Sequence, residues 1–125
     1  MKNTAERIRI IRVFKKYSRL GLASNNLDAL DVYERIKGCS ASRRQANELL
    51  AVYETLRFLR LSGKLECIDA LKEVYFSLSD RTPRRNEISE RVLRYSQERY
   101  CDQRTVYRHL SYAVRLYERI LTSSL

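Results

Sequence analysis

Glycine and proline are scarce in this chain, which has three glycines and one proline among its 125 residues. A β-sandwich or β-barrel needs residues suited to tight turns about every ten positions, so this scarcity argues against both architectures. Leucine, glutamate, arginine and alanine, which are abundant here, favour helices. We therefore predict an all-α fold of about six helices in a compact bundle.

Apolar residues recur at helical spacing in six segments. The predicted helices cover about residues 4–20, 26–36, a third that starts after Ser40 or Ser42 and runs to about residue 61, then 65–78, 83–98 and 103–122, so the last helix is long. Residues suited to helix caps stand at the predicted starts, and glycines follow three of the predicted ends. The proposed caps are Asn25 or Asn26, Ser40 or Ser42, Thr82 followed by Pro83, and Asp102, and the proposed terminators are Gly21, Gly38 and Ser62-Gly63.

Basic residues outnumber acidic ones by 25 to 15, and the excess is concentrated at the two ends of the chain. Residues 1–24 carry seven basic residues and one acidic residue, and residues 81–125 carry ten and five. Residues 25–80 are close to neutral. Such concentrated positive charge favours binding to a polyanion, although a solvated face that keeps a protein soluble has the same composition.

Residues 87–110 follow the pattern of a helix-turn-helix. A helix leads into a short polar turn around Cys101 and Asp102, and a second helix then opens with polar and basic residues. Ser96 supplies a small residue where the two helices can cross closely, and Val106 supplies the β-branched side chain that fills the angle between them. We therefore predict a C-terminal helix-turn-helix whose second helix starts near Gln103.

The last predicted helix has two opposite faces. Its apolar face consists of Val106, Leu110, Ala113, Tyr117 and Ile120. Its polar face consists of Arg104, Arg108, Ser111, Arg115 and Arg119. A helix that is buried on one side and rich in arginine on the other can lie against DNA, because arginine bonds guanine, glutamine bonds adenine and both bond phosphate.

These faces give a set of candidate DNA contacts around the start of the last helix. The predicted base-reading residues are Gln103, Arg104, Thr105, Tyr107 and Arg108. The predicted phosphate contacts are Arg84, Arg85, Ser111 and Arg115, with Arg12, Lys15 and Lys16 of the first helix as a secondary set. The preferred partner is double-stranded DNA.

The segment Asp102-Gln-Arg-Thr-Val-Tyr-Arg-His-Leu110 and the helix that follows it resemble the C-terminal helix-turn-helix (region four) of sigma factors. They resemble more closely the small phage late-gene regulators of the ArpU and RinA type. Leu71-Lys-Glu-Val-Tyr-Phe76 is similar to the helix before the motif in those families, so the resemblance covers roughly the last 55 residues. Tyr100 stands where the turn often has glycine, and Arg99 replaces an expected hydrophobic residue.

The resemblance implies a transcriptional regulator of phage or prophage origin that acts at a promoter, alone or through RNA polymerase. In that reading, residues 1–80 form an N-terminal helical region whose role is open, and residues 81–125 form the DNA-binding region of one compact unit. A homodimer would read two half-sites about one helical turn apart.

Two other classes of function stay open. The first is a helical protein–protein adaptor or oligomerisation module acting on RNA polymerase or a phage protein, in which the apolar face of the last helix would be an association surface. The second is a small terminase subunit, which also uses a helix-turn-helix to mark viral DNA but assembles into large rings.

Catalysis and metal binding lack the residues that they need. Cys39, Cys67 and Cys101 are widely spaced, and His109 is the only histidine, so no zinc-ligand pattern is present. We expect free thiols and a structural role for His109. Without a glycine-rich phosphate loop or a Ser-His-Asp set, we predict no enzyme activity and no cofactor. We also expect a cytoplasmic protein without signal peptide, membrane span or membrane partner.

Overall fold

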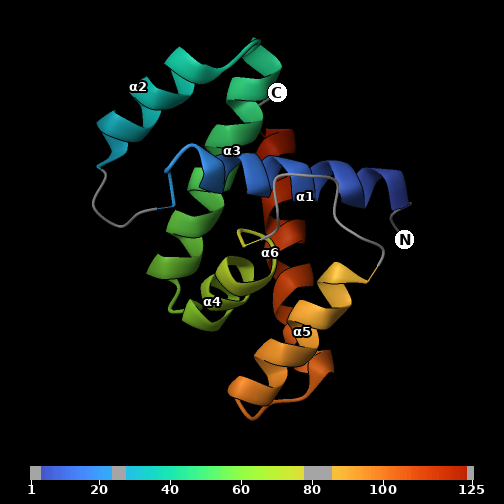
Figure 1. Ribbon diagram of the computed structural model, residues 1–125. Helices are drawn as coiled ribbons and strands as arrows, with labels where there is room; N and C mark the ends of the chain where they lie inside the picture. The colour runs from blue at the N-terminus through green and yellow to red at the C-terminus, as the bar shows by residue number, and fades with distance from the viewer. Residues whose placement is uncertain (1–3, 24–27, 78–85, 124–125) are drawn as a thin grey trace.

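The computed structural model describes residues 4–23, 28–77 and 86–123. These residues form six α-helices and no strand: α1 (Thr4–Arg19), α2 (Ala29–Cys39), α3 (Arg43–Leu61), α4 (Leu65–Val74), α5 (Glu87–Glu98) and α6 (Gln103–Ser123). Helix α3 packs against α6, and α1 crosses in front of both in the view of Figure 1. The predicted all-α fold with a long final helix is confirmed.

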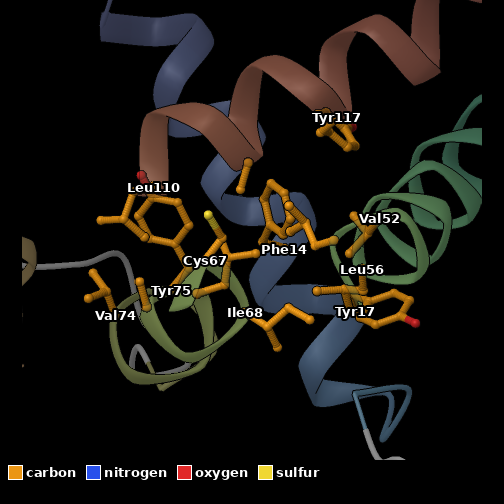
Figure 2. Close-up of a cluster of buried hydrophobic side chains, with 14 of the residues drawn as sticks. Phe14, Tyr17, Val52, Leu56, Cys67, Ile68, Val74, Tyr75, Leu110 and Tyr117 are labelled. Carbon is orange, nitrogen blue, oxygen red and sulfur yellow. The ribbon is translucent and has the colours of Figure 1, made fainter. Parts of the chain in front are cut away.

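One hydrophobic core contains residues from all six helices. Phe14 of α1 is fully buried near its middle, and its ring centroid lies 5.3 Å from that of Tyr117 on α6. Two rings that follow α4, Tyr75 and Phe76, have centroids 6.0 and 6.2 Å from that of Phe14. Figure 2 shows Phe14, Tyr75 and Tyr117 together in the core. Because these rings come from both sides of the predicted boundary at residue 80, the residues before and after that boundary share one core.

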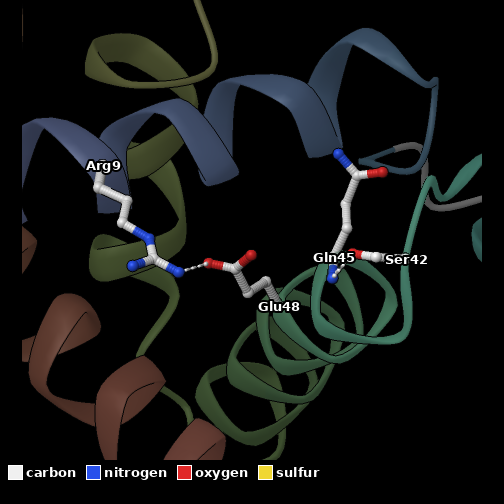
Figure 3. A network of polar contacts seen from close by, with 4 residues as sticks. All are labelled: Arg9, Ser42, Gln45 and Glu48. Carbon is white, nitrogen blue, oxygen red and sulfur yellow. Dashed lines mark hydrogen bonds and ion pairs between the residues drawn. The ribbon is translucent and has the colours of Figure 1, made fainter.

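An ion pair attaches α1 to the start of α3, and two capping hydrogen bonds fix that start (Figure 3). Arg9 Nη2 lies 3.2 Å from Glu48 Oε2. At the start of α3, Ser42 Oγ accepts a hydrogen bond from the Gln45 amide at 3.1 Å, and the Gln45 side chain accepts one from the Ala41 amide at 2.7 Å. Because exposed ion pairs contribute at most about 1 kcal/mol, burial supplies most of the stability of this packing.

Helix α1 ends in the Schellman hydrogen-bond pattern. The amides of Gly21 and Leu22 donate to the carbonyl oxygens of Ser18 and Tyr17 at 3.0 and 3.3 Å. The pattern places the first residue after the helix cap in the left-handed backbone conformation, which glycine adopts without steric cost. Gly21 has φ 75°, and Gly63 closes α3 in the same way with φ 74°. Both glycines therefore terminate their helices as predicted.

The second helix differs from the prediction at both ends. Helix α2 starts after Asp28, whose Oδ1 accepts a hydrogen bond from the Asp31 amide at 2.8 Å. The predicted caps, Asn25 and Asn26, lie outside the described residues. Gly38 was wrongly predicted to stop the helix, which continues through it to Cys39. Gly38 is exposed, and no atom lies within 4 Å of where its Cβ would be, so nothing in its surroundings forces a turn there.

Helix α4 ends at Val74, before the predicted end at Leu78, which lies outside the described residues. The amides of Tyr75 and Phe76 both donate to the Leu71 carbonyl oxygen at 2.9 Å. These two hydrogen bonds end the helix and direct both rings toward Phe14. Burial of the two aromatic side chains therefore ends α4 earlier than its apolar pattern predicts.

Helix α5 (Glu87–Glu98) begins in the described residues with Asn86 at the cap position. Asn86 makes no side-chain capping hydrogen bond. Thr82 and Pro83 lie outside the described residues.

Candidate nucleic-acid interface

Helices α4, α5 and α6 pack against one another in pairs, and α5 leads into α6 through four residues. The two positions that the motif requires are both buried. Ser96 on α5 is 5% exposed, and its Oγ donates to the Leu93 carbonyl oxygen at 2.7 Å. Val106 on α6 is fully buried. Both positions are therefore buried, and their contact at the crossing of α5 and α6 stays a prediction.

The turn between α5 and α6 has the backbone conformation of a glycine-containing turn, although it contains no glycine. The Cys101 amide donates to the Ser96 carbonyl oxygen at 2.9 Å, and the Tyr100 amide donates to that of Gln97 at 3.4 Å. This is the same Schellman pattern that closes α1 and α3. Tyr100 has φ 53°, which is left-handed, and its side chain is 97% exposed. Tyr100 therefore occupies the position that glycine holds at the other two helix ends.

Arg99, the other departure from the usual motif, attaches the turn to its neighbours. Its guanidinium carbon lies 5.5 Å from the centroid of the Tyr95 ring, and its Nη2 lies 3.8 Å from Asp69 Oδ2 on α4. An exposed cation over an aromatic ring contributes roughly 0.5–1 kcal/mol. A stacked arginine thus covers the ring here in place of a hydrophobic residue.

Asp102 caps the start of α6, as predicted. Its Oδ1 accepts a hydrogen bond from the Arg104 amide at 2.9 Å. Its carbonyl oxygen accepts hydrogen bonds from the Thr105 and Val106 amides at 3.0 and 3.3 Å. These bonds fix the first turn of α6, where the predicted base-reading residues begin.

Helix α6 separates its apolar and basic residues onto two faces. The predicted apolar residues Val106, Leu110, Ala113 and Tyr117 are buried, and Ile120 packs against the core. They pack within the chain, so any surface for association lies elsewhere. On the opposite face the predicted polar residues Arg104, Arg108, Ser111, Arg115 and Arg119 are all exposed.

The predicted base-reading residues lie together on the first two turns of α6. Gln103, Arg104, Tyr107 and Arg108 are exposed, and Thr105 is half-buried. Sequence reasoning missed one basic neighbour, Lys64, whose Nζ lies 5.6 Å from the centroid of the exposed Tyr112 ring. Lys64 precedes α4, and no local pattern signals that it comes close to α6.

The predicted phosphate contacts do not all lie on this surface. Ser111 and Arg115 continue the exposed face of α6, whereas Arg84 and Arg85 lie outside the described residues. Lys15 is 9% exposed, so its burial gives no support to a phosphate contact. Arg12 and Lys16 line a separate cleft between α1 and α3, together with Glu48, whose carboxylate opposes phosphate binding.

A larger cleft lies between α1 and α6, with a volume of about 610 Å³. It is lined by Arg7, Ile10, Ile11, Tyr75, Ser111, Val114 and Arg115. The cleft therefore brings an N-terminal arginine beside two of the predicted phosphate contacts. Arg7 was not among the predicted residues, because its only sequence signal is its place beside the apolar stripe of α1.

His109 and Cys67 form a half-buried pair next to the core. Cys67 Sγ lies 3.8 Å from His109 Nδ1. Burial is the main cause that raises the pKa of the Cys67 thiol, and Glu66 raises it further, so the thiol stays protonated at neutral pH. No group of three or more His, Cys, Asp or Glu residues that could hold a metal ion occurs in the described part of the chain.

Among the residues that the structure describes, no helix is both long and apolar enough to cross a lipid bilayer. Comparison of the chain with protein-family models, curated proteins and solved structures finds no match. Its function is therefore argued from the geometry and chemistry of the surface itself.

Proposed function

We propose that this chain is a DNA-binding transcriptional regulator, not an enzyme, and that the first two turns of α6 read base edges in the major groove. The observation that supports this most strongly is the exposed row of Gln103, Arg104, Tyr107 and Arg108 on a helix whose opposite face is buried. A recognition helix needs this division, because its packed side fixes the angle at which its polar side enters the groove.

The turn supports the same proposal. Asp102 caps α6, and the closure at Tyr100 sets the direction in which α6 leaves α5. Arginine and glutamine at the start of that helix are side chains that discriminate guanine and adenine in the major groove. Ser111 and Arg115, one to two turns further along α6, would then contact the phosphate backbone.

The resemblance to ArpU- and RinA-type regulators and to sigma-factor region four adds to the proposal. It favours a phage or prophage origin and action at a promoter, alone or through RNA polymerase. Reading of two half-sites by a homodimer would appear as a two-fold symmetric binding sequence.

The first experiment is selection of bound duplexes from a random-sequence library, followed by binding to the winner and to a scrambled duplex. We expect Arg104→Ala to cost about 1–3 kcal/mol on the selected duplex and much less on the scrambled one. Alanine favours helices, and Arg104 is exposed, so the fold should persist. Circular dichroism checks this point.

Arg119→Ala is the matched control, because Arg119 lies on the same face of α6 but roughly 22 Å further along the helix axis. Arg119→Ala should weaken binding to both duplexes slightly and to the same extent. Equal losses on both duplexes for Arg104→Ala would refute the base-reading role. If the chain binds no DNA but binds a protein in a salt-insensitive way, the adaptor hypothesis is favoured. If the chain assembles into a large ring, the terminase hypothesis is favoured.

A further inference from the structure

The cleft between α1 and α6 combines a polar opening with an apolar base. Its exposed members are Arg7 on α1 and Ser111 and Arg115 on α6. Its other members, Ile10, Ile11, Tyr75 and Val114, are buried or half-buried. Two guanidinium groups from different helices and one hydroxyl therefore border the same opening, with hydrocarbon beneath them.

The lining of this cleft differs from that of the other two described clefts in its acidic residues. None of the described residues that line it is acidic. The cleft between α1 and α3 contains Glu48, and the one between α3 and the end of α6 contains Glu54. In the α1–α3 cleft Glu48 is ion-paired with Arg9, whereas no carboxylate among the described lining residues of the α1–α6 cleft competes with an anion for its arginines.

The cleft also lies in line with the proposed reading face. Ser111 and Arg115 follow Arg108 on the same exposed side of α6, and Arg115 lies roughly 10 Å beyond it along the helix axis. In helix-turn-helix complexes, residues beside the reading side chains contact the sugar-phosphate backbone that borders the groove. A backbone strand that leaves the reading face would therefore pass the opening of this cleft.

We propose that Arg7, Ser111 and Arg115 together bind a backbone phosphate of the DNA duplex, so that helix α1 of the N-terminal region forms part of the DNA-binding surface. This rests on the proposed function and assigns α1 a role in it. Arginine donates several hydrogen bonds in a fixed fork, and two such groups with one hydroxyl can satisfy several phosphate oxygens.

The protonation of the Tyr75 phenol is compatible with an anion in this cleft. Burial is the main cause that raises the pKa of its phenol, Arg7 lowers that pKa, and Tyr107 raises it. The phenol is therefore neutral at physiological pH and adds no negative charge beside the arginines. The electrostatic influence of Arg7 on Tyr75 also agrees with the position of both residues in the wall of one cleft.

The test compares Arg7→Gln with Arg12→Gln in the full chain. Both arginines are exposed on α1, but Arg12 lines the α1–α3 cleft. Binding is measured on the selected and scrambled duplexes between 50 and 200 mM salt. We expect Arg7→Gln to weaken binding to both duplexes by the same factor. It should also reduce the slope of log affinity against log salt concentration by about 0.9. Across this range the variant should lose about 3.5-fold less affinity than the wild type.

Two further arms separate a phosphate contact from a general charge effect. Arg7→Lys keeps the charge and should restore most of the salt slope. Replacing single phosphates by neutral methylphosphonates should reveal a flanking position where the wild type loses affinity and Arg7→Gln loses none. Thermal melts confirm that each variant is folded.

The possible results separate this inference from the proposed function. If the wild type binds DNA but Arg7→Gln and Arg12→Gln have equal effects, only the general charge of α1 matters and the proposed site is overturned. The same holds if no methylphosphonate position distinguishes Arg7→Gln from the wild type. If the wild type binds no duplex at all, the proposed function fails together with this site.

Discussion

Tyr100 is held in a backbone conformation that is costly for any residue with a side chain. At φ 53° its Cβ lies close to the following carbonyl oxygen, which costs roughly 1–2 kcal/mol. Its side chain is 97% exposed, so little packing compensates for that cost. The hydrogen bonds of the turn and the packing of α5 against α6 are what hold Tyr100 in this conformation.

Replacement of Tyr100 by glycine should therefore stabilise the protein. Glycine removes the steric cost but loses roughly 0.5–1 kcal/mol through the greater freedom of the unfolded chain, which leaves a gain of about 0.5–1 kcal/mol. Urea denaturation measures the free energy of unfolding. Tyr100→Ala is the control, because alanine removes the ring and keeps the Cβ, so its stability should stay near that of the wild type. If the glycine variant is no more stable than the alanine variant, the turn carries no such strain.

The sequence could predict those residues of the site whose roles depend only on their spacing within one segment. Ser96, Val106 and Asp102 act within one short segment, so their roles follow from spacing along the chain. Arg7 and Lys64 could not be found in this way, because their positions beside α6 depend on how distant helices pack. The burial of Lys15 likewise depends on tertiary packing.

At the scale of helices, the ends were harder to predict than the faces. The apolar face of α6 lies inward as predicted, because the periodicity of its apolar residues determines which side of the helix is buried. The end of α4 depends on the contact of Tyr75 and Phe76 with Phe14, which is a tertiary interaction. Helix α2 passes through Gly38 because one glycine costs a helix only about 1 kcal/mol.

Capping by Asp102 gives a prediction for α6 as an element. Asp102→Ala removes the hydrogen bond to the Arg104 amide and should destabilise the protein by about 1 kcal/mol. Compared with Asp102→Asn, which loses the same charge, Asp102→Ala should bind the selected duplex more weakly, because the proposed reading residues begin in the first turn of α6. The free energy of unfolding and the affinity for the selected duplex are both measured.

Asp102→Asn separates the cap from its charge. Asparagine caps helices about as well as aspartate, so stability should stay near that of the wild type. Loss of a negative charge beside the phosphates should at the same time tighten binding to every duplex. A stability loss equal to that of Asp102→Ala would show that the carboxylate charge, and not the capping hydrogen bond, stabilises α6.

For the whole molecule, the shared core couples the proposed DNA-binding helices to the N-terminal region. Tyr17 and Tyr117 are each 1% exposed, and they lie on α1 and α6 within that core. Burial is the main cause that raises the pKa of both phenols above their ordinary value of 10.0. Tyr53 also raises that of Tyr17, and Glu48 that of Tyr117, whereas nearby arginines lower both.

These raised pKa values predict unfolding in alkali. The folded protein holds the two phenolic protons more tightly than the unfolded chain, so the stability they contribute is complete below pH 10.0 and is lost as the pH rises above it. The loss should approach 1.4 kcal/mol per pH unit for each tyrosine, where 1.4 is the approximate free energy of one pKa unit. Tyrosinate absorbance and circular dichroism, followed together through a base titration, measure the coupling.

Tyr17→Phe and Tyr117→Phe should each shift the alkaline unfolding midpoint to higher pH, provided that loss of the hydroxyl leaves the fold intact at neutral pH. Tyr100→Phe serves as the control and should leave the midpoint unchanged, because that side chain projects into solvent and loses no hydration on folding. If all the tyrosines ionise near pH 10 while the helical signal is retained, the two phenols are accessible to solvent and the shared core is looser than the structure indicates. A single transition in which ionisation and loss of helix coincide would show that α1 and α6 unfold together, because the two phenols lie on those two helices.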